Sequence, residues 1–284
     1  SKNLSNSEIE SKELTLNNSI NQLTKANYQM VKEAQSLFLL YHSLDFDYKD
    51  MELQLQLRES EMEFTKLKRN LGMARDEEVE AIETAIEDLN TAIDNIADQK
   101  KDILGQLNYL MGWEQDKPLR LGQAPKLAHK EVVIDYDDDL IQVKDNSYSW
   151  LTEQNDYELK NLAFEDAKKN YDSSSDERKE AKLDLQKALI SLNNMEKDLK
   201  KNFESLYDDL IDKQEALDLE EEDLLEANED YRLAKLKYNL GMISELEKEN
   251  AKMQYEKQEV ELKRARHNLK RAYLEYQWIK EGLS

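Results

Sequence analysis

The residues with the clearest potential for metal chemistry form a short acidic run near the middle of the chain. Asp135, Asp137, Asp138 and Asp139 surround Tyr136. Carboxylate oxygens are the ligands that Ca²⁺ and Mg²⁺ prefer, so this run is a conceivable cation site. It lacks the glycine-punctuated spacing of a calcium-binding loop, and a solvated acidic linker is the favoured interpretation. We therefore predict no metal site and no cofactor.

Histidine is the second residue type that could support catalysis. His42, His129 and His267 are far apart in the sequence, and the chain has no cysteine to pair with them. The sequence contains no nucleophile motif, no glycine-rich phosphate loop and no zinc-type histidine spacing. His267 falls on a heptad position and is predicted to be packed rather than catalytic. We predict no catalytic residue and a protein that is not an enzyme.

Composition indicates long helices rather than a compact globular fold. Charged residues make up 36% of the 284 residues, and there are only 6 Gly and 2 Pro. A sheet-rich chain of this length needs more turn residues. The hydrophobic share of 39% suits helices that bury a narrow stripe and expose the rest.

The formal net charge of −22 limits the choice of partners. This charge argues against nucleic acid and anionic membrane surfaces as partners, because both attract basic clusters. No run of 18 apolar residues is present, so we predict no membrane-spanning helix. The absence of cysteine fits an extracytoplasmic location. Because the chain starts on Ser1 without a signal peptide, removal of an upstream segment is expected.

An internal repeat gives the strongest signal in the sequence. KLKRNLGM begins at residue 66 and KLKYNLGM begins at residue 235, 169 positions later. Such a repeat sets the architecture. We predict repeat 1 over 1–112, a linker over 113–136 and repeat 2 over 137–284, with tips at 70–73 and 239–242.

Heptad spacing follows the tip in each repeat. In repeat 1 the stripe is interrupted only by Lys100 and contains Val79, Ile82, Ile86, Leu89, Ile93, Ile96, Ile103, Leu107 and Leu110. In repeat 2 it contains Ala251, Tyr255, Gln258, Leu262, Ala265, Leu269, Ala272, Tyr276, Ile279 and Leu283. A second stripe on the same segment contains Leu246, Met253, Val260, His267 and Leu274. Two stripes predict coiled-coil neighbours on two sides.

The expected helices follow from these stripes and from the helix breakers. The breakers after the first hairpin are Gly112, Pro118, Gly122 and Pro125. Helix is then expected to run without a break from near 137 to about 171, with a turn at 172–177. The fold class is therefore predicted to be all-α, with two tandem long coiled-coil hairpins and no β-barrel strands.

Each tip has the chemistry of a helix reversal. Gly72 and Gly241 are suited to the left-handed conformation that closes a helix. After the second tip, Ser244 and Glu247 have the spacing of a capping box. The start after the first tip, at 74–78, has no Ser or Thr but is acidic, which also suits a helix N-terminus.

With these motifs the sequence resembles the TolC-like outer-membrane efflux factors. The resemblance rests first on the two tip segments and the helices that follow them, at 67–113 and 238–276, and the first of these ends in LNYLMGW at 107–113. It also rests on 150–171, which is similar to the segment that opens the family's second repeat. It covers most of the chain. In that family a β-hairpin lies between the paired helices of each repeat, whereas here only YDSSSDERKE occupies that place in repeat 2.

The resemblance implies a tube built by a homotrimer in the cell envelope, outside the cytoplasmic membrane. Its tips would dock a periplasmic adaptor (a membrane fusion protein) and, through it, an inner-membrane transporter. It also implies that Glu247, and Glu78 in repeat 1, face the lumen near the constriction, although an ordinary solvated helix-start acid is the simpler interpretation. The predicted docking residues are Asn70, Leu71, Gly72, Met73, Asn239, Leu240, Gly241 and Met242.

One alternative of a different class stays open. A structural coiled-coil scaffold with a duplicated hairpin and no channel would show the same repeat. The second stripe over 246–274 favours the conduit, because a simple two-stranded coiled coil does not need it.

Overall fold

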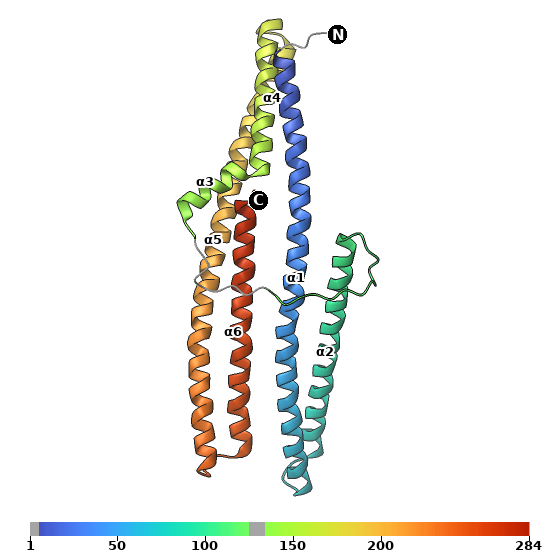
Figure 1. The fold of residues 1–284 in the computed structure, drawn as a ribbon, viewed down its shortest axis with the longest axis vertical. Coiled ribbons are helices and arrows are strands. Elements are labelled where there is room, and N and C mark those ends of the chain that lie inside the picture. The colour runs from blue at the N-terminus through green and yellow to red at the C-terminus, as the bar shows by residue number, and fades with distance from the viewer. Residues whose placement is uncertain (1–5, 125–133, 284) are drawn as a thin grey trace. The chain divides into compact units, whose positions relative to one another are not determined.

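The computed structural model describes residues 6–124 and 134–283, and every regular element in these ranges is an α-helix (Figure 1). In chain order the helices are α1 (Asn6–Asn70), α2 (Asp76–Leu110), α3 (Tyr136–Asn146), α4 (Tyr148–Asn170), α5 (Asp176–Asn239) and α6 (Glu245–Lys280). The predicted all-α fold with two long hairpins is confirmed as α1–α2 and α5–α6. None of the described helices is both long and apolar enough to cross a membrane.

The chain forms two compact units, and neither is a continuous stretch of sequence. Unit 1 contains the described parts of 1–33, 130–211 and 272–284. Unit 2 contains the described parts of 34–129 and 212–271. Each unit draws on both predicted repeats, so this division does not test the repeat boundaries at 112 and 136, which stay a prediction.

Unit 1 places α4 between the first half of α1 and the first half of α5. Asn18 Nδ2 of α1 donates to Asp156 Oδ1 of α4 at 2.8 Å. On the other side of α4, Ser191 Oγ of α5 donates to Glu153 Oε2 at 2.7 Å. The fully buried apolar side chains of this unit lie where α3, α5 and the end of α6 meet, and they include Val143, Phe203, Leu210, Tyr276 and Ile279.

Unit 2 contains the tip-side parts of both hairpins, and their tips lie at the same end (Figure 1). A cluster of Leu44, Ile96, Ile103 and Leu107 forms the core between α1 and α2. The second hairpin joins the first through α6 and α1, where Arg264 forms an ion pair with Asp47.

The two stripes predicted on α6 contact two different helices. On the first stripe, Tyr276 packs against Phe203 of α5, with ring centroids 5.6 Å apart. On the second stripe, the His267 ring meets Phe46 of α1 at 5.5 Å. The prediction of neighbours on two sides is confirmed, and each apolar stripe removes its side chains from water against its own partner.

The helix predicted over 137–171 is wrong in one respect, because it is broken at Ser147. This residue is fully buried, caps the end of α3 and begins α4, and its Oγ accepts a hydrogen bond from Trp150 N at 3.2 Å. A serine side chain offers the backbone an alternative to helical hydrogen bonding and so favours a cap. Close by, the Tyr148 amide donates to Gly282 O at 3.3 Å, so the end of α6 abuts the start of α4.

Residues 113–124, the first part of the predicted linker, fold back within unit 2. Asn108, which is fully buried, donates through Nδ2 to Gln115 O at 3.1 Å and to Lys117 O at 2.7 Å. Leu119 and Leu121 then pack against the α1–α2 core cluster. Residues 125–133 of the linker, which include Pro125 and His129, lie outside the described residues.

Candidate docking tips

Both tips end their helices with the same pattern of backbone hydrogen bonds. At the first tip, Met73 N donates to Lys68 O at 2.8 Å, and Gly72 N donates to Arg69 O at 2.9 Å. At the second, Met242 and Gly241 make the equivalent bonds to Lys237 and Tyr238 at 2.9 Å each. These are Schellman motifs, in which the closing residue is left-handed. Gly72 has φ 71° and Gly241 has φ 69°, which fulfils the role predicted for both glycines.

Large apolar side chains are presented to solvent at both tips. The exposed fractions are 75% for Leu71 and 72% for Met73, against 66% for Leu240 and 68% for Met242. Water contact with these side chains is unfavourable, so a matched pair of such tips at one end of a unit is a candidate surface for a partner. Their use for docking stays a prediction.

The helix after each tip starts with a carboxylate that reaches back to the turn. Glu247 Oε2 accepts from Ser244 N at 2.7 Å, and Ser244 Oγ accepts from Glu247 N at 3.2 Å, which confirms the capping box. Hydrogen bonds from the Ser244 amide and hydroxyl lower the pKa of Glu247. At the first tip, Glu78 Oε1 accepts from Arg75 N at 3.2 Å, so half of the box is kept without a Ser or Thr.

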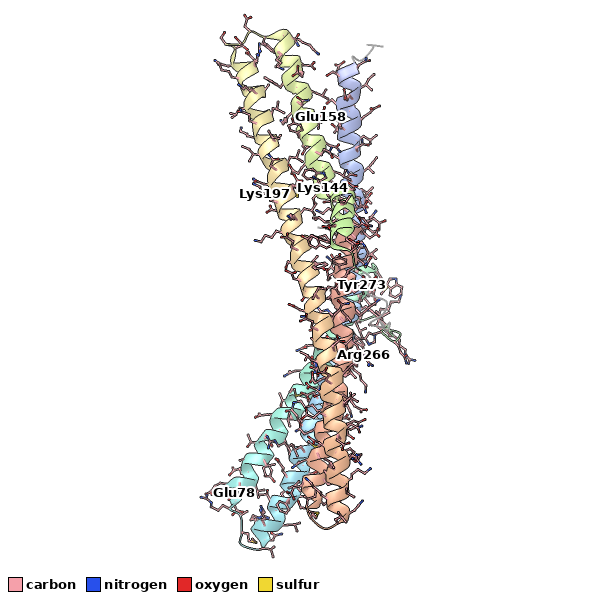
Figure 2. All side chains as sticks on the ribbon, turned by 90° about the vertical axis from the view of Figure 1, so that its left-hand side faces the viewer. Glu78, Lys144, Glu158, Lys197, Arg266 and Tyr273 are labelled. Carbon is pink, nitrogen blue, oxygen red and sulfur yellow. The ribbon has the colours of Figure 1, made fainter. Side chains whose placement is uncertain are left out.

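Glu78 lies beside the α1–α2 tip (Figure 2). Glu78 and Glu247 therefore have one demonstrated role, which is to satisfy free amides at helix starts. A role facing a lumen is a separate prediction for each of them.

The acidic run at 135–139 is not simply solvated, and here the prediction is wrong for one residue. Asp139 is only 6% exposed. Its carboxylate accepts from the Tyr276 hydroxyl at 2.7 Å and forms an ion pair with Lys280 of α6. Burial alone would raise the pKa of Asp139, but the bonds from Lys280, Tyr276 and the Asp135 amide outweigh it and lower the pKa. Burial, followed by the bond to Asp139, raises the pKa of Tyr276.

This buried network is the feature that sequence reasoning missed. The available signal was the position of Lys280, one helical turn after the stripe residue Tyr276 and next to Ile279, because a lysine beside a core position needs a counter-charge. The described residues contain no group of three or more His, Asp or Glu side chains placed to hold a metal ion.

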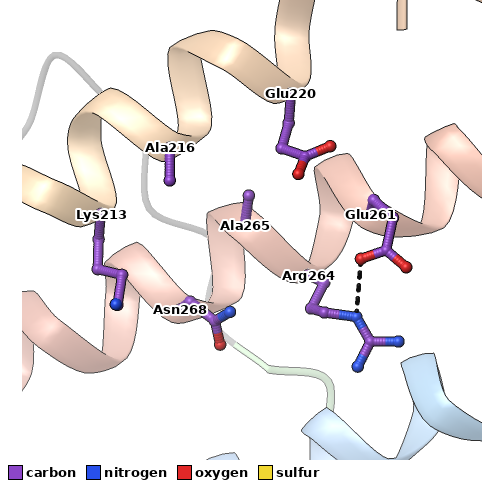
Figure 3. Close-up of a pocket in the computed structure, with 7 residues that line it drawn as sticks. All are labelled: Lys213, Ala216, Glu220, Glu261, Arg264, Ala265 and Asn268. Atoms are coloured by element: carbon purple, nitrogen blue, oxygen red, sulfur yellow. Dashed lines mark hydrogen bonds and ion pairs between the residues drawn. The ribbon is translucent and has the colours of Figure 1, made fainter. Parts of the chain in front are cut away.

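A small cavity of about 170 Å³ lies between α5 and α6 in unit 2 (Figure 3). Ala216 and Ala265 face each other across it, and Arg264 Nε donates to Glu261 Oε2 at 3.1 Å on its rim. At the position of Ala265 the first repeat has Ile96, 169 residues earlier, which is buried in the α1–α2 core. The cavity therefore results from the smaller side chain at this position. The charged residues on its rim do not indicate a particular ligand or reaction.

No protein-family model matches the sequence, and no curated protein sequence matches it. Among solved structures, the outer membrane protein VceC from Vibrio cholerae matches with a TM-score of 0.67 at 12% identity, over 98% of this chain and 76% of that one. The outer-membrane channel OprN gives 0.66 at 13% identity, over 94% and 71%. The Campylobacter jejuni outer membrane channel CmeC gives 0.65 at 9% identity, over 96% and 66%.

The chain has a TolC-like helical fold. The match spans nearly the whole chain, includes both hairpins and confirms the resemblance stated from the tips and repeats. OprN and CmeC are outer-membrane channels. At these identities the likeness shows the fold.

Proposed function

We propose that the chain is a component of a TolC-like efflux or secretion conduit in the cell envelope, and that its tips dock an adaptor protein. The observation that carries the proposal is the pair of equivalent tips at one end of unit 2, each presenting an exposed leucine and methionine on a Schellman turn. Two copies of one surface on each chain suit a partner that meets several equivalent sites. In this role three copies of the chain assemble into the tube.

A row of exposed apolar side chains on α1 supports a role in which the chain assembles with other copies rather than acting alone. Large apolar side chains of α1 in unit 1 are exposed at heptad spacing, and they include Ile9, Leu16, Leu23 and Met30. A coiled-coil stripe of this kind is stable when another helix covers it. The same proposal includes a periplasmic adaptor that binds the tips and an inner-membrane transporter that the adaptor connects to the conduit.

Docking is tested by cross-linking from the tips in the cell envelope. Because the chain has no cysteine, Leu240→Cys or Met242→Cys introduces a unique thiol. We expect a thiol-reactive cross-linker to join either tip variant to an adaptor protein identified by mass spectrometry. Leu225→Cys is the matched control, since Leu225 is 71% exposed on α5 away from the tip. Equal capture from the tip and control positions would refute docking.

Assembly is tested separately by light scattering and by small-angle scattering in solution. A hollow trimer supports the conduit. A rod-like monomer or dimer that persists at high protein concentration would instead support the alternative, a coiled-coil scaffold without a channel.

A further inference from the structure

His267 occupies an unusual place, in the contact that joins the two hairpins. It lies on the second stripe of α6, seven residues after the buried Val260, and is itself only 7% exposed. Its ring packs against Phe46 of α1 in a T-shaped contact with centroids 5.5 Å apart. Of the residues on this stripe it alone can gain a full charge in the range between pH 5 and pH 8.

The surroundings of the ring favour the neutral form. The Leu39 backbone of α1 favours the protonated ring, but burial outweighs it. Nε2 is buried without a hydrogen-bond partner among the described residues. An added proton at Nε2 would create a buried N–H group and a positive charge with no acceptor, and such groups are costly to keep away from water.

The charged groups around the ring do not compensate for that proton. Arg271 of α6 and His42 of α1 oppose a positive charge at His267, and Asp45 of α1 favours one. Asp45 already forms an ion pair with Lys100 of α2 and contacts His42. On the α5 side of α6, Glu221 is paired with Arg266.

We propose that the α1–α6 contact of unit 2 is a pH-sensitive joint, in which protonation of His267 separates α6 from α1 and so parts the two hairpins. Arg264 and Asp47, less than one helical turn away, hold the same two helices together by an ion pair. The contact therefore combines this ion pair with the packing of a histidine ring whose charge depends on pH. The proposal does not depend on the conduit function.

The direction of the pH dependence follows from the direction in which the pKa of His267 is shifted. Burial lowers the pKa of His267 below its ordinary value of about 6.5, because the charged form is poorly solvated there. The stabilisation of the closed joint is fully present above about pH 6.5 and is lost as the pH falls toward and through the lowered pKa.

The joint is tested by distance measurements between spin labels. Ser60 of α1 and Asn250 of α6 are both exposed, and they lie at a similar level because α1 and α6 are antiparallel, as the Asp47–Arg264 and Phe46–His267 contacts show. With cysteines at both positions, we expect the distance distribution to lengthen and broaden between pH 7.5 and pH 5.5. Ser60 and Asn90, one on each helix of the first hairpin, form the control pair and should show no change.

Substitutions of His267 test whether this residue causes the change in the Ser60–Asn250 distance. His267→Leu keeps the stripe apolar and should abolish the shift, and His267→Gln is a second neutral side chain in case the leucine variant does not fold. His42→Asn should leave the shift in place. An unchanged Ser60–Asn250 distance in the parent chain, or a shift that survives in both His267 variants, would overturn the proposal.

Discussion

At the scale of single residues, Asp139 connects α3 to the end of α6. Its carboxylate satisfies both the Tyr276 hydroxyl and the Lys280 ammonium inside a largely buried site. Hydrogen bonds to a charged group are typically worth more than neutral ones because the charge strengthens them at low local dielectric.

We expect Asp139→Asn to lower the free energy of unfolding by about 1.5–3 kcal/mol at pH 7, because it removes a charged hydrogen bond and leaves Lys280 without its counter-charge. The lowered pKa of Asp139 makes its contribution complete above about pH 4, the ordinary range for Asp, and lost as the pH falls through the lowered value. Urea unfolding at pH 7 and pH 3 checks this. The difference between parent and variant should be smaller at pH 3 than at pH 7, and an equal difference at both would contradict the assignment.

At the scale of elements, the glycines of the turns are not equivalent. A Cβ at Gly241 would meet no atom within 4 Å, so its requirement is the left-handed backbone alone. A Cβ at Gly282 would lie 2.2 Å from Asn146 O, so close approach of the α3–α4 junction adds a second requirement there.

We therefore expect alanine substitutions at these glycines to lower the stability of the fold by different amounts. Gly72→Ala and Gly241→Ala should each destabilise by about 1–2 kcal/mol, the usual cost of a left-handed residue with a Cβ. Gly282→Ala should cost more than either. Gly122→Ala is the matched control, because a Cβ there meets nothing and the backbone is not left-handed, so it should be nearly neutral. Thermal unfolding followed by circular dichroism gives the order, and an equal loss at 122 and 241 would contradict it.

Features that depend on residues close together in the sequence could be predicted from it. Features that depend on contacts between residues far apart in the sequence could not. The tips and the Ser244–Glu247 box depend on residues within a few positions of each other, and the stripes of α2 and α6 depend on a regular period. The break at Ser147 and the burial of Asp139 depend on Gly282 and Tyr276, which are more than 130 residues away in the chain. Periodicity carries no information about such pairs.

At the scale of the whole molecule, charge is spread unevenly over the helices of unit 2. Residues 76–110 of α2 contain ten acidic and two basic residues, a net charge of −8. Residues 212–239 of α5 contain ten acidic and four basic residues, a net charge of −6, whereas residues 245–271 of α6 contain six acidic and eight basic residues, a net charge of +2. Self-repulsion between copies is then concentrated on α2 and α5.

Salt should therefore promote association of the chain with itself. Raising the ionic strength from about 10 mM to about 150 mM shortens the screening length from roughly 30 Å to 8 Å, which weakens repulsion between exposed carboxylates. We expect sedimentation velocity to show a larger assembled fraction at the higher ionic strength. Dissociation with added salt would show instead that attractive ion pairs dominate the contact between copies.

The composition of unit 2 also has a consequence for how its core is assembled. The unit takes a tip-side hairpin segment from each predicted repeat, and α1 and α6 make the contact between them. A polypeptide with a single repeat would supply only one of these segments, so two such molecules would have to meet to form the same contact. Carrying both repeats in one chain turns that encounter into an intramolecular one, at an effective concentration set by the connecting segment.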